Sequence, residues 1–382
     1  MIVVCHYGEI GLKGKNRKFF EERLVKNIKK ALPKGSFSNV KRISGRILIN
    51  ANGEKAIIKE ALKNVFGLVN FSFGISCEQS IEVIKQKAVE LLKDIRFQTF
   101  RVSATRSNKS FPLTSQQINE IVGAWILGRS STPSKVSLEK PDVVLFIEVV
   151  DNYALLFTEK IRGQGGLPVG VSGRAVSLIS GGIDSPVASF LAMKRGLEII
   201  FVHFHALPFV DKASVEKVKE LVRVLKKHQG NSKLYLAPFA EIQKEILLKT
   251  KEGLRVVLYR RLMFHIAQEI AKREKAFGLI TGENLGQVAS QTIENIAVIE
   301  SGLLMPVLRP LIMYDKAEII QKAKEIGTFE LSIQEHQDCC SRFLPKHPEI
   351  RANLKEVLQE EKKIKIKKLV SLTLKNLTIE EI

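Results

Sequence analysis

Cysteine is scarce in this sequence, with four among 382 residues. Four thiols in so long a chain do not make a disulfide framework. No C-x-x-C pair occurs either, so neither a zinc ribbon nor an iron–sulfur cluster is indicated. Cys5 and Cys77 lie among apolar residues, and we expect both to be buried small hydrophobic side chains.

Long apolar runs are missing as well. No stretch of 18 consecutive apolar residues occurs, which excludes a membrane-spanning helix of ordinary composition. The opening residues MIVVC are too short for a signal peptide and lack a basic leader and a small-residue cleavage site. We therefore expect a cytoplasmic protein with no membrane partner, and the length predicts two or three domains.

Acidic residues are in the minority: 60 lysines and arginines stand against 40 aspartates and glutamates, for a formal charge of +20 and a pI near 9.7. Such an excess points to a polyanionic partner, and to nucleic acid before a membrane surface. The excess is uneven, because residues 11–50 hold twelve basic and only two acidic side chains. A second cluster, residues 362–368, is at least as consistent with a solvated face of a helix or strand.

From residue 175 onward, strand-like and helix-like segments alternate. Apolar runs of strand length occupy 175–179, 198–206, 233–239 and 276–281, and helical patterns cover 214–228, 254–273 and 316–326. The last of these helices opens with the capping box Asp315–Glu318 and ends at Gly327. This alternation predicts an α/β domain built on a parallel sheet with helices on both faces, whose ligands bind beyond the carboxyl ends of the strands.

Before residue 170 the order of elements is mixed, which indicates an α+β organisation. Strands are expected at 2–6, 46–50, 68–76, 97–104, 143–149 and 153–158, and helices at 16–32, 55–65, 79–92 and 114–126. The glycine-rich, aperiodic stretch 163–173 is typical of an ordered linker or loop.

The stretch SLISGGIDSPVASF, residues 177–190, lies between a predicted strand and a predicted helix. Asp184 or Ser185 is suited to cap that helix, Pro186 to its first turn, and Gly196 to a left-handed C-terminal position. The glycines let backbone N–H groups converge and the helix N-terminus adds partial positive charge, so the expected ligand is a phosphate. No lysine follows the glycines, which excludes a Walker A loop. A simple turn with a capping aspartate is the structural alternative.

Two basic segments suit contact with RNA. Residues 6–17 contain three glycines and then basic side chains that open a helix, a combination able to hold a phosphate backbone. Residues 99–115 place basic side chains and Phe111 in or just past a strand, where bases stack and phosphates are neutralised. A solvated loop and a charged surface strand are the alternatives. The candidate RNA-binding residues are Lys13, Lys15, Arg17, Arg101, Arg106 and Lys109.

Three further features bear on chemistry. The loop TGENLGQVASQ, residues 281–291, follows a predicted strand and is suited to line a nucleotide pocket, although many loops of this position look alike. For Arg260 and Arg261, on the long helix, a structural ion pair is the ordinary explanation. Cys339 and Cys340 are adjacent in a polar stretch with basic neighbours that lower a thiol pKa, which favours a reactive role over burial.

S-G-G-x-D-S-P between strand and helix resembles the PP-loop of ATP pyrophosphatases. With Y-G-E-I-x-L-K-G-K-N-R, F-R-V-x-x-x-R-S-N-K-S-F-P-x-T-S and G-G-L-P-V-G-x-S-G-R before it, the chain resembles the tRNA 4-thiouridine synthetase (tRNA sulfurtransferase) family over almost its whole length. The resemblance implies an N-terminal ferredoxin-like domain (1–54), a THUMP RNA-binding domain (55–162), a linker (163–174) and an α/β PP-loop ATP-pyrophosphatase domain (175–382).

The resemblance also implies a reaction: with ATP and Mg²⁺, uridine 8 of tRNA becomes 4-thiouridine. The uridine carbonyl oxygen attacks the α-phosphate, pyrophosphate leaves, and a persulfide sulfur displaces AMP. Asp184 would organise pyrophosphate and metal, and Cys340, with Cys339 beside it, would handle the sulfur; no dedicated metal-binding cluster of side chains is expected. The implied ATP-binding residues are Leu178, Ile179, Ser180, Gly181, Gly182, Asp184, Ser185, His203, Phe204, Arg260, Gly282 and Gln291.

Many members of this family continue into a rhodanese domain, whereas this sequence ends at Ile382 and resembles the short form. The expected sulfur source is therefore a cysteine desulfurase or another persulfide donor, and the family leads us to expect a homodimer. The alternative function is a tRNA-binding protein whose PP-loop nucleotide site does not thiolate. A PP-loop ligase of small molecules is disfavoured, because it needs neither the basic N-terminal half nor adjacent cysteines.

Overall fold

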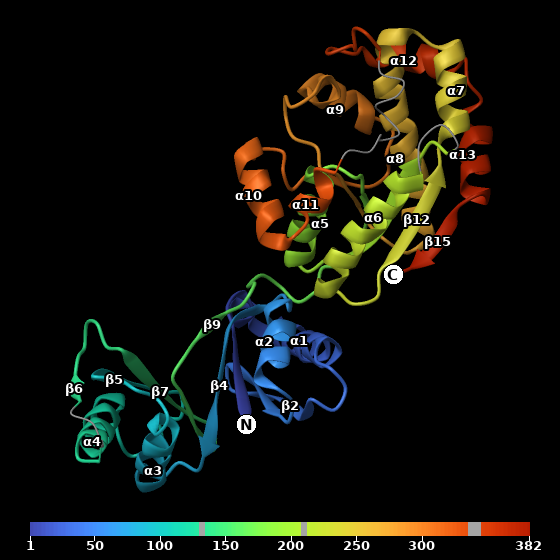
Figure 1. Cartoon of the computed structure of the whole chain (residues 1–382). Helices are drawn as coiled ribbons and strands as arrows, with labels where there is room; N and C mark the ends of the chain where they lie inside the picture. Colours follow the sequence, from blue (N-terminus) through green and yellow to red (C-terminus); the bar gives the residue numbers. More distant parts are fainter. Residues whose placement is uncertain (130–133, 208–211, 335–344) are drawn as a thin grey trace. The chain divides into compact units, whose positions relative to one another are not determined.

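The computed structural model describes the whole chain except residues 130–133, 208–211 and 335–344. It divides into two compact units, Met1–Pro168 and Val169–Ile382, each built around its own sheet (Figure 1). Within the described ranges, no helix is long and apolar enough to cross a membrane.

The N-terminal unit contains one nine-stranded mixed sheet with the order β2-β3-β1-β4-β8-β7-β5-β6, and β9 pairs with β4. Its strands are β1 (Ile2–Tyr7), β2 (Phe37–Ile43), β3 (Arg46–Ala51), β4 (Leu68–Cys77), β5 (Thr99–Arg106), β6 (Lys135–Val136), β7 (Val143–Val150), β8 (Tyr153–Phe157) and β9 (Ile161–Arg162). Its α-helices are α1 (Arg17–Ala31), α2 (Lys55–Lys63), α3 (Ile81–Leu92) and α4 (Ser115–Leu127).

Strand β4 joins two halves of this unit. Its residues 68–74 pair with β1, and its residues 74–77 pair with β8. In the first half, α1 and α2 pack with β1, β3 and β4 in one apolar core. In the second half, α3 and α4 pack against β5 and β7 in another. Helix α2 therefore contributes to the first core, and the domain boundary between residues 54 and 55 stays a prediction.

Three strands of this unit were not predicted: β2 and the two-residue strands β6 and β9. β2 is an edge strand that pairs with β3, and only Val40 and Ile43 of its seven residues are buried. Because four of its seven side chains are polar, the sequence of β2 carries little of the apolar alternation that marks a strand. The prediction for the cysteines is confirmed for Cys5, which is buried; Cys77 is half-buried, and burial raises the pKa of its thiol to about 11.

The C-terminal unit contains a six-stranded sheet with the order β14-β13-β10-β11-β12-β15. Its strands are β10 (Arg174–Leu178), β11 (Glu198–His205), β12 (Lys233–Pro238), β13 (Leu279–Ile280), β14 (Val307–Leu308) and β15 (Thr378–Glu381). Five strands are parallel, as expected. The edge strand β15 is antiparallel to β12, which corrects the prediction of a purely parallel sheet. The predicted strand 276–281 is reduced to the two residues of β13.

Helices cover both faces of this sheet (Figure 1). They are α5 (Asp184–Lys194), α6 (Lys212–Leu225), α7 (Ala240–Lys249), α8 (Arg255–Arg273), α9 (Ile293–Glu300), α10 (Lys316–Ile326), α11 (Phe329–Ser332), α12 (Leu354–Glu361) and α13 (Ile366–Lys375). Val176, Val202 and Tyr235 pack with α8 in the main core, whereas Ser177 faces α5 and hydrogen-bonds Ser189. Helices α5 and α8 therefore lie on opposite faces of β10, with the turn between β10 and α5 at its carboxyl end.

Several local predictions are confirmed. Asp315 and Glu318 form the capping box of α10, and Gly327 ends that helix at φ 76°. Gly196 has φ 88°, the left-handed conformation expected after α5. The lysines of the 362–368 cluster are exposed while its isoleucines pack inward, an arrangement that fits both a solvated face and contact with RNA.

Candidate active site

The turn between β10 and α5 is held by serine hydroxyls. The Ser180 backbone N–H donates to Ser185 Oγ at 2.8 Å, and the Gly182 N–H donates to Ser180 Oγ at 3.3 Å. Ser189 Oγ in turn donates to the Ser185 carbonyl at 2.8 Å. These bonds fold the chain back over the first turn of α5. Residues 181–183 are thereby held at a helix N-terminus, the arrangement that binds phosphate.

Gly282, just past β13, lies against this helix N-terminus. A Cβ atom there would sit 2.6 Å from the Ser185 nitrogen and 2.8 Å from the carbonyl carbon of Asp184. Both are backbone atoms that cannot rotate away, so this position accepts only glycine without displacing α5. The loop 281–291, which was predicted to line a pocket, thus packs through Gly282 against the start of α5, where the phosphate-binding turn ends.

Asp184 is the first residue of α5 and caps nothing: neither it nor Ser185 accepts a capping bond, so the capping prediction was wrong. Its carboxylate instead accepts a hydrogen bond from Lys316 Nζ at 2.6 Å and from Gln287 Nε2 at 3.1 Å. The side chain is 21 % exposed. Two donors far away in the sequence, one in the loop 281–291 and one at the start of α10, fix the carboxylate and leave it accessible.

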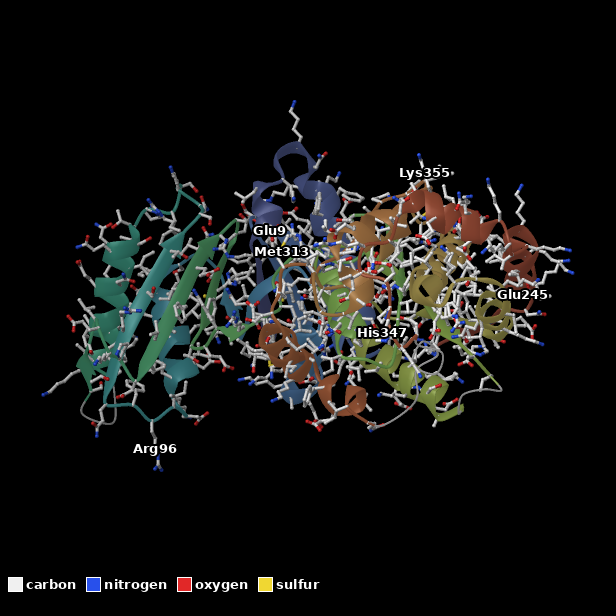
Figure 2. The ribbon with its side chains drawn as sticks, turned by 90° about the horizontal axis from the view of Figure 1, so that it is seen from above. Glu9, Arg96, Glu245, Met313, His347 and Lys355 are labelled. Carbon is white, nitrogen blue, oxygen red and sulfur yellow. The ribbon has the colours of Figure 1, made fainter. Side chains whose placement is uncertain are left out.

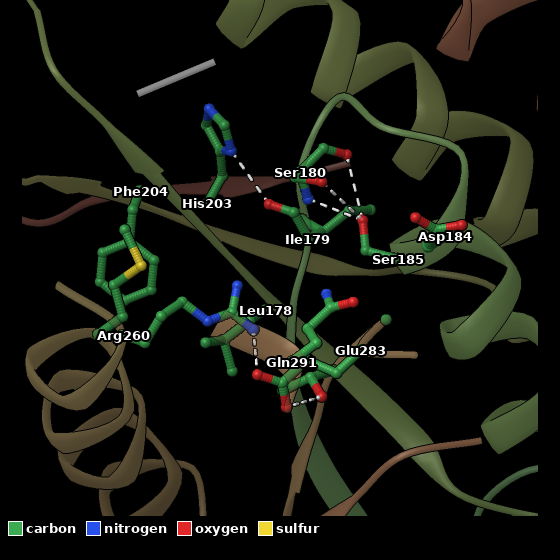
Figure 3. A pocket seen from close by; sticks show the side chains of 13 residues that line it. Leu178, Ile179, Ser180, Asp184, Ser185, His203, Phe204, Arg260, Glu283 and Gln291 are labelled. Carbon is green, nitrogen blue, oxygen red and sulfur yellow. Dashed lines mark hydrogen bonds and ion pairs between the residues drawn. The ribbon is translucent and has the colours of Figure 1, made fainter. Parts of the chain in front are cut away.

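A pocket of about 220 Å³ opens at this edge of the sheet. It is lined by Leu178, Ile179, Ser180, Asp184, Ser185, His203, Phe204, Arg260, Met263, Thr281, Gly282, Glu283 and Gln291 (Figure 3). The structure thus brings ten of the twelve residues predicted to bind ATP into one cavity. Figure 3 shows His203, Phe204 and Arg260 toward one end and Asp184 at the other.

His203 is buried and lies 3.0 Å, through Nδ1, from the carbonyl oxygen of Ile179. A carbonyl only accepts, so Nδ1 carries the proton and donates it. Burial lowers the pKa of His203 to about 4, which keeps the ring neutral at pH 7. Nε2, the unprotonated ring nitrogen, is then a hydrogen-bond acceptor.

Arg260 is held by a buried carboxylate. Glu283, 1 % exposed, accepts hydrogen bonds from Arg260 Nη2 and from Arg309 Nε at 2.6 Å, and Thr281 Oγ1 donates to it at 3.0 Å. Burial alone would raise the pKa of Glu283, but the two arginines outweigh burial and lower it. The structural ion pair expected for Arg260 exists, and the same arginine lines the pocket. The neighbouring Arg261 forms a separate buried pair with Glu361.

Comparisons with known proteins agree with this geometry. The family described as "Thiamine biosynthesis protein (ThiI)" matches residues 170–366, and the "ThiI ferredoxin-like domain" and "THUMP domain" families match 2–72 and 78–159. A "Probable tRNA sulfurtransferase" of Moorella thermoacetica is 43% identical over 99% of this chain and 96% of its own length. One from Thermoanaerobacter sp. (strain X514) is 42% identical over 97% of each chain. The chain belongs to the tRNA sulfurtransferase (ThiI) family.

A solved structure of the same family extends the likeness to three dimensions. It is described as a 4-thiouridine synthetase–RNA complex with bound ATP, has 40% sequence identity and a TM-score of 0.91, and covers 100% of this chain and 99% of its own. The fold expected for a sulfurtransferase of this family, with ferredoxin-like, THUMP and PP-loop domains, is therefore confirmed.

The predicted RNA-binding residues of this sulfurtransferase differ in their surroundings. Arg17 bonds Glu21 and Tyr7, Arg101 donates to the Leu138 carbonyl, and Arg106 donates to the carbonyls of Phe111 and Leu113. Lys13 lies over the Phe20 ring at 5.2 Å. Lys15 and Lys109 are exposed. The three arginines thus make hydrogen bonds within the protein, and the two exposed lysines present charge to solvent.

Some site residues escaped sequence reasoning. Lys316 and Gln287 hold Asp184, and Glu283 holds Arg260. One signal was available: Lys316 opens α10, where a cation is disfavoured by the helix dipole, so a nearby anion was to be expected. Cys339 and Cys340 lie outside the described residues. Among those that are described, no cluster of His, Cys, Asp and Glu suited to a metal is found.

Proposed function

We propose that this protein thiolates uridine 8 of tRNA to 4-thiouridine, using ATP and releasing AMP and pyrophosphate. The observation that carries the proposal is the pocket at the carboxyl edge of β10, which is lined by residues of the turn before α5, by Asp184 and by Arg260. Further support comes from the full-length likeness to a 4-thiouridine synthetase crystallised with RNA and ATP. The class of enzyme agrees with the tRNA sulfurtransferases of the family.

ATP lies along the pocket with its base toward His203 and Phe204. The neutral His203 ring presents Nε2 as an acceptor, which suits the exocyclic amine of adenine. Leu178 and Ile179 supply apolar contact, and Arg260 is placed to neutralise phosphate charge. The β- and γ-phosphates lie against residues 181–183, at the N-terminus of α5. Gly282 and Gln291 complete the wall.

Mg²⁺ fits this site without a cage of protein ligands. Magnesium is commonly held by one or two carboxylates together with substrate phosphates. Asp184 offers one carboxylate at the phosphate end, oriented by Lys316 and Gln287. The ion would neutralise charge on the departing pyrophosphate. Asp184 acts electrostatically, and Lys316 adds a positive charge 2.6 Å from it.

The reaction proceeds in two displacements. The O4 atom of uridine attacks the α-phosphate, the bond to the β-phosphate breaks, and pyrophosphate leaves. The AMP group is then bonded to C4 of the uracil ring through the oxygen that was O4. A persulfide sulfur attacks C4 and AMP departs with that oxygen. A second thiol attacks the cysteine sulfur and forms a disulfide with it, which breaks the original sulfur–sulfur bond and leaves the new sulfur on the base. Cys340, with Cys339 as the neighbouring thiol, carries the persulfide, supplied by a cysteine desulfurase or another persulfide donor.

The N-terminal unit binds the tRNA. Its ferredoxin-like and THUMP families, its basic residues 11–50 and the exposed Lys15 and Lys109 favour contact with the phosphate backbone. The proposed set of RNA-binding residues is completed by Lys13, Arg17, Arg101 and Arg106. We further propose that the protein acts in the cytoplasm as a homodimer, and that domain boundaries fall at 54/55, 162/163 and 174/175.

The test uses purified protein, unmodified tRNA, ATP, Mg²⁺ and sulfide, with Asp184→Ala in parallel. The tRNA is digested and its nucleosides are identified by mass spectrometry, while AMP is measured separately. We expect 4-thiouridine at position 8 with the unaltered protein and none with the variant. Binding of tRNA without AMP or thiouridine would refute the proposal and favour a tRNA-binding protein with a non-thiolating nucleotide site.

A further inference from the structure

Four exposed apolar side chains lie within two residues of Gln287 or within three of Lys316, the two residues that bond Asp184. Leu285, Val288, Met313 and Tyr314 are 41, 50, 81 and 37 % exposed, and we call them the rim patch (Met313 is labelled in Figure 2). Single exposed apolar residues are common on proteins, but a group of them beside a polar site indicates a surface that contacts something.

The rim patch comes from two loops that are tied together. The Leu285 N–H donates to the Ile312 carbonyl at 3.2 Å, and Asn284 Nδ2 donates to the Leu311 carbonyl at 2.9 Å. The first loop carries residues 285–288 and the second carries residues 313–314, so these bonds hold the two segments that bear the patch side by side.

The same two loops reach Asp184. Gln287, between Leu285 and Val288, bonds its carboxylate at 3.1 Å, and Lys316, two residues after Tyr314, bonds it at 2.6 Å. The rim patch therefore flanks the phosphate end of the pocket, where the reacting base has to arrive. The bonds of Gln287 and Lys316 to the Asp184 carboxylate hold the rim patch in this position.

We propose that the rim patch receives the target nucleobase as it leaves the RNA stack, with Tyr314 as the stacking surface. This inference rests on the proposed function, since the base comes from the tRNA that the protein modifies. A base inside a folded RNA cannot reach an enzyme's reactive centre until it unstacks, and apolar or aromatic side chains replace the lost stacking.

The size of the patch favours a base over a protein. A stable protein–protein interface takes about 20–30 residues from each partner. Four side chains on two loops match a single nucleobase, and one aromatic ring among them matches the way single-stranded RNA is held. A docking surface for the sulfur donor is the competing occupant, and the experiment separates the two.

The probe is tRNA with 2-aminopurine in place of the purine that follows the target uridine. Its fluorescence rises when the neighbouring base leaves the stack, and the signal needs neither ATP cleavage nor sulfur. The variants are Tyr314→Ala, Met313→Ala and Tyr314→Phe, which keeps the ring. Phe277→Ala is the matched control, because Phe277 is 79 % exposed at the opposite, amino end of β13.

With the unaltered protein and with Tyr314→Phe, we expect a clear rise in fluorescence. In Tyr314→Ala the rise should fall by at least half, and the kcat/KM of thiolation with sulfide should fall about ten-fold, the scale of one lost base stack. Met313→Ala should show a smaller loss of the same kind. The affinity for tRNA should stay within about two-fold in every variant, because backbone contacts dominate it.

Equal fluorescence in Tyr314→Ala and the unaltered protein would overturn the inference. So would a loss of thiolation that appears only when a persulfide-carrying protein, and not sulfide, supplies the sulfur, since the patch would then dock that protein. If the unaltered protein makes no thiouridine but the fluorescence depends on Tyr314 as described, the proposed function fails and the base-receiving patch stands.

Discussion

Replacing Glu283 by glutamine tests how the pocket is held together. Glu283 is 1 % exposed and is the shared partner of Arg260 and Arg309, whose side chains are 23 % and 9 % exposed. Glutamine keeps the shape but removes the charge, so two neighbouring guanidinium groups lose their common counter-ion. Removing one partner of a buried ion pair usually destabilises a protein by about 3–5 kcal/mol.

Two features place the expected loss near the lower end of that range. Arg260 retains some contact with water, and Arg309 still pairs with Glu300. We therefore expect a loss of about 3 kcal/mol. In a unit of roughly 200 residues each kcal/mol lowers the melting temperature by about 2–4 °C, so the melting temperature should fall by about 6–12 °C.

The assay is thermal unfolding of the full chain followed by circular dichroism and by tryptophan fluorescence. The single tryptophan, Trp125, lies in the N-terminal unit, so its transition serves as an internal control that should not move. Glu300→Gln is the matched variant: Glu300 pairs with the same Arg309 but is 35 % exposed, and its loss should be about 1 kcal/mol or less. Equal shifts for the two variants would refute the reasoning.

Three further predictions follow from the site. Gly282→Ala should destabilise the C-terminal unit by about 1–3 kcal/mol and abolish AMP formation, because its Cβ would meet the Ser185 nitrogen at 2.6 Å; calorimetry and an AMP assay measure both. Lys316→Met should change stability by at most about 1 kcal/mol, since its pair with Asp184 is partly exposed, yet slow AMP formation by about a hundred-fold or more. Burial lowers the pKa of His203 to about 4, so the neutral ring favours the folded state at a pH above its ordinary pKa near 6.5. This contribution, roughly 3 kcal/mol, is lost as the pH falls from 6.5 toward 4. His203→Asn should therefore reduce the change in unfolding free energy over this pH range, as measured by denaturation at a series of pH values.

The first two of these have a control within the chain. Gly123 is a mid-helix residue of α4 whose added Cβ meets nothing within 4 Å, so Gly123→Ala should be neutral or stabilising by up to about 1 kcal/mol. Lys322 forms an exposed pair with Glu325 on the same helix as Lys316, and Lys322→Met should leave AMP formation unchanged. A slope against pH that is identical with and without His203 would contradict the assignment of its burial.

The local part of the site could be predicted from the sequence, because its signals are local. Ile179, the two glycines and Pro186 mark a strand, a turn and a helix within a few residues, and Gly196 and Gly327 end their helices as their conformational freedom suggests. Parallel strands with helices on both faces followed from alternation alone. The order of the strands did not, since sheet neighbours are chosen by packing between distant segments.

The charge network around the pocket could not be predicted. Lys316 is 132 residues from Asp184, and Gln287 is 103 residues away. No local pattern couples residues at such separations. The capping prediction for Asp184 failed for the same reason: a local rule assigned its carboxylate to the helix, whereas two distant donors occupy it. Edge strands such as β15 also escaped, because their exposed side chains carry little periodicity.

The most direct test of the account follows the oxygen of the target base. tRNA carrying ¹⁸O at O4 of uridine 8 is incubated with the full-length protein, ATP, Mg²⁺ and sulfide, and the AMP is analysed by mass spectrometry. If O4 attacks the α-phosphate, every AMP released with a thiouridine contains one ¹⁸O atom. AMP that forms with thiouridine but carries no ¹⁸O would contradict an adenylated uridine and, with it, the central claim about this pocket.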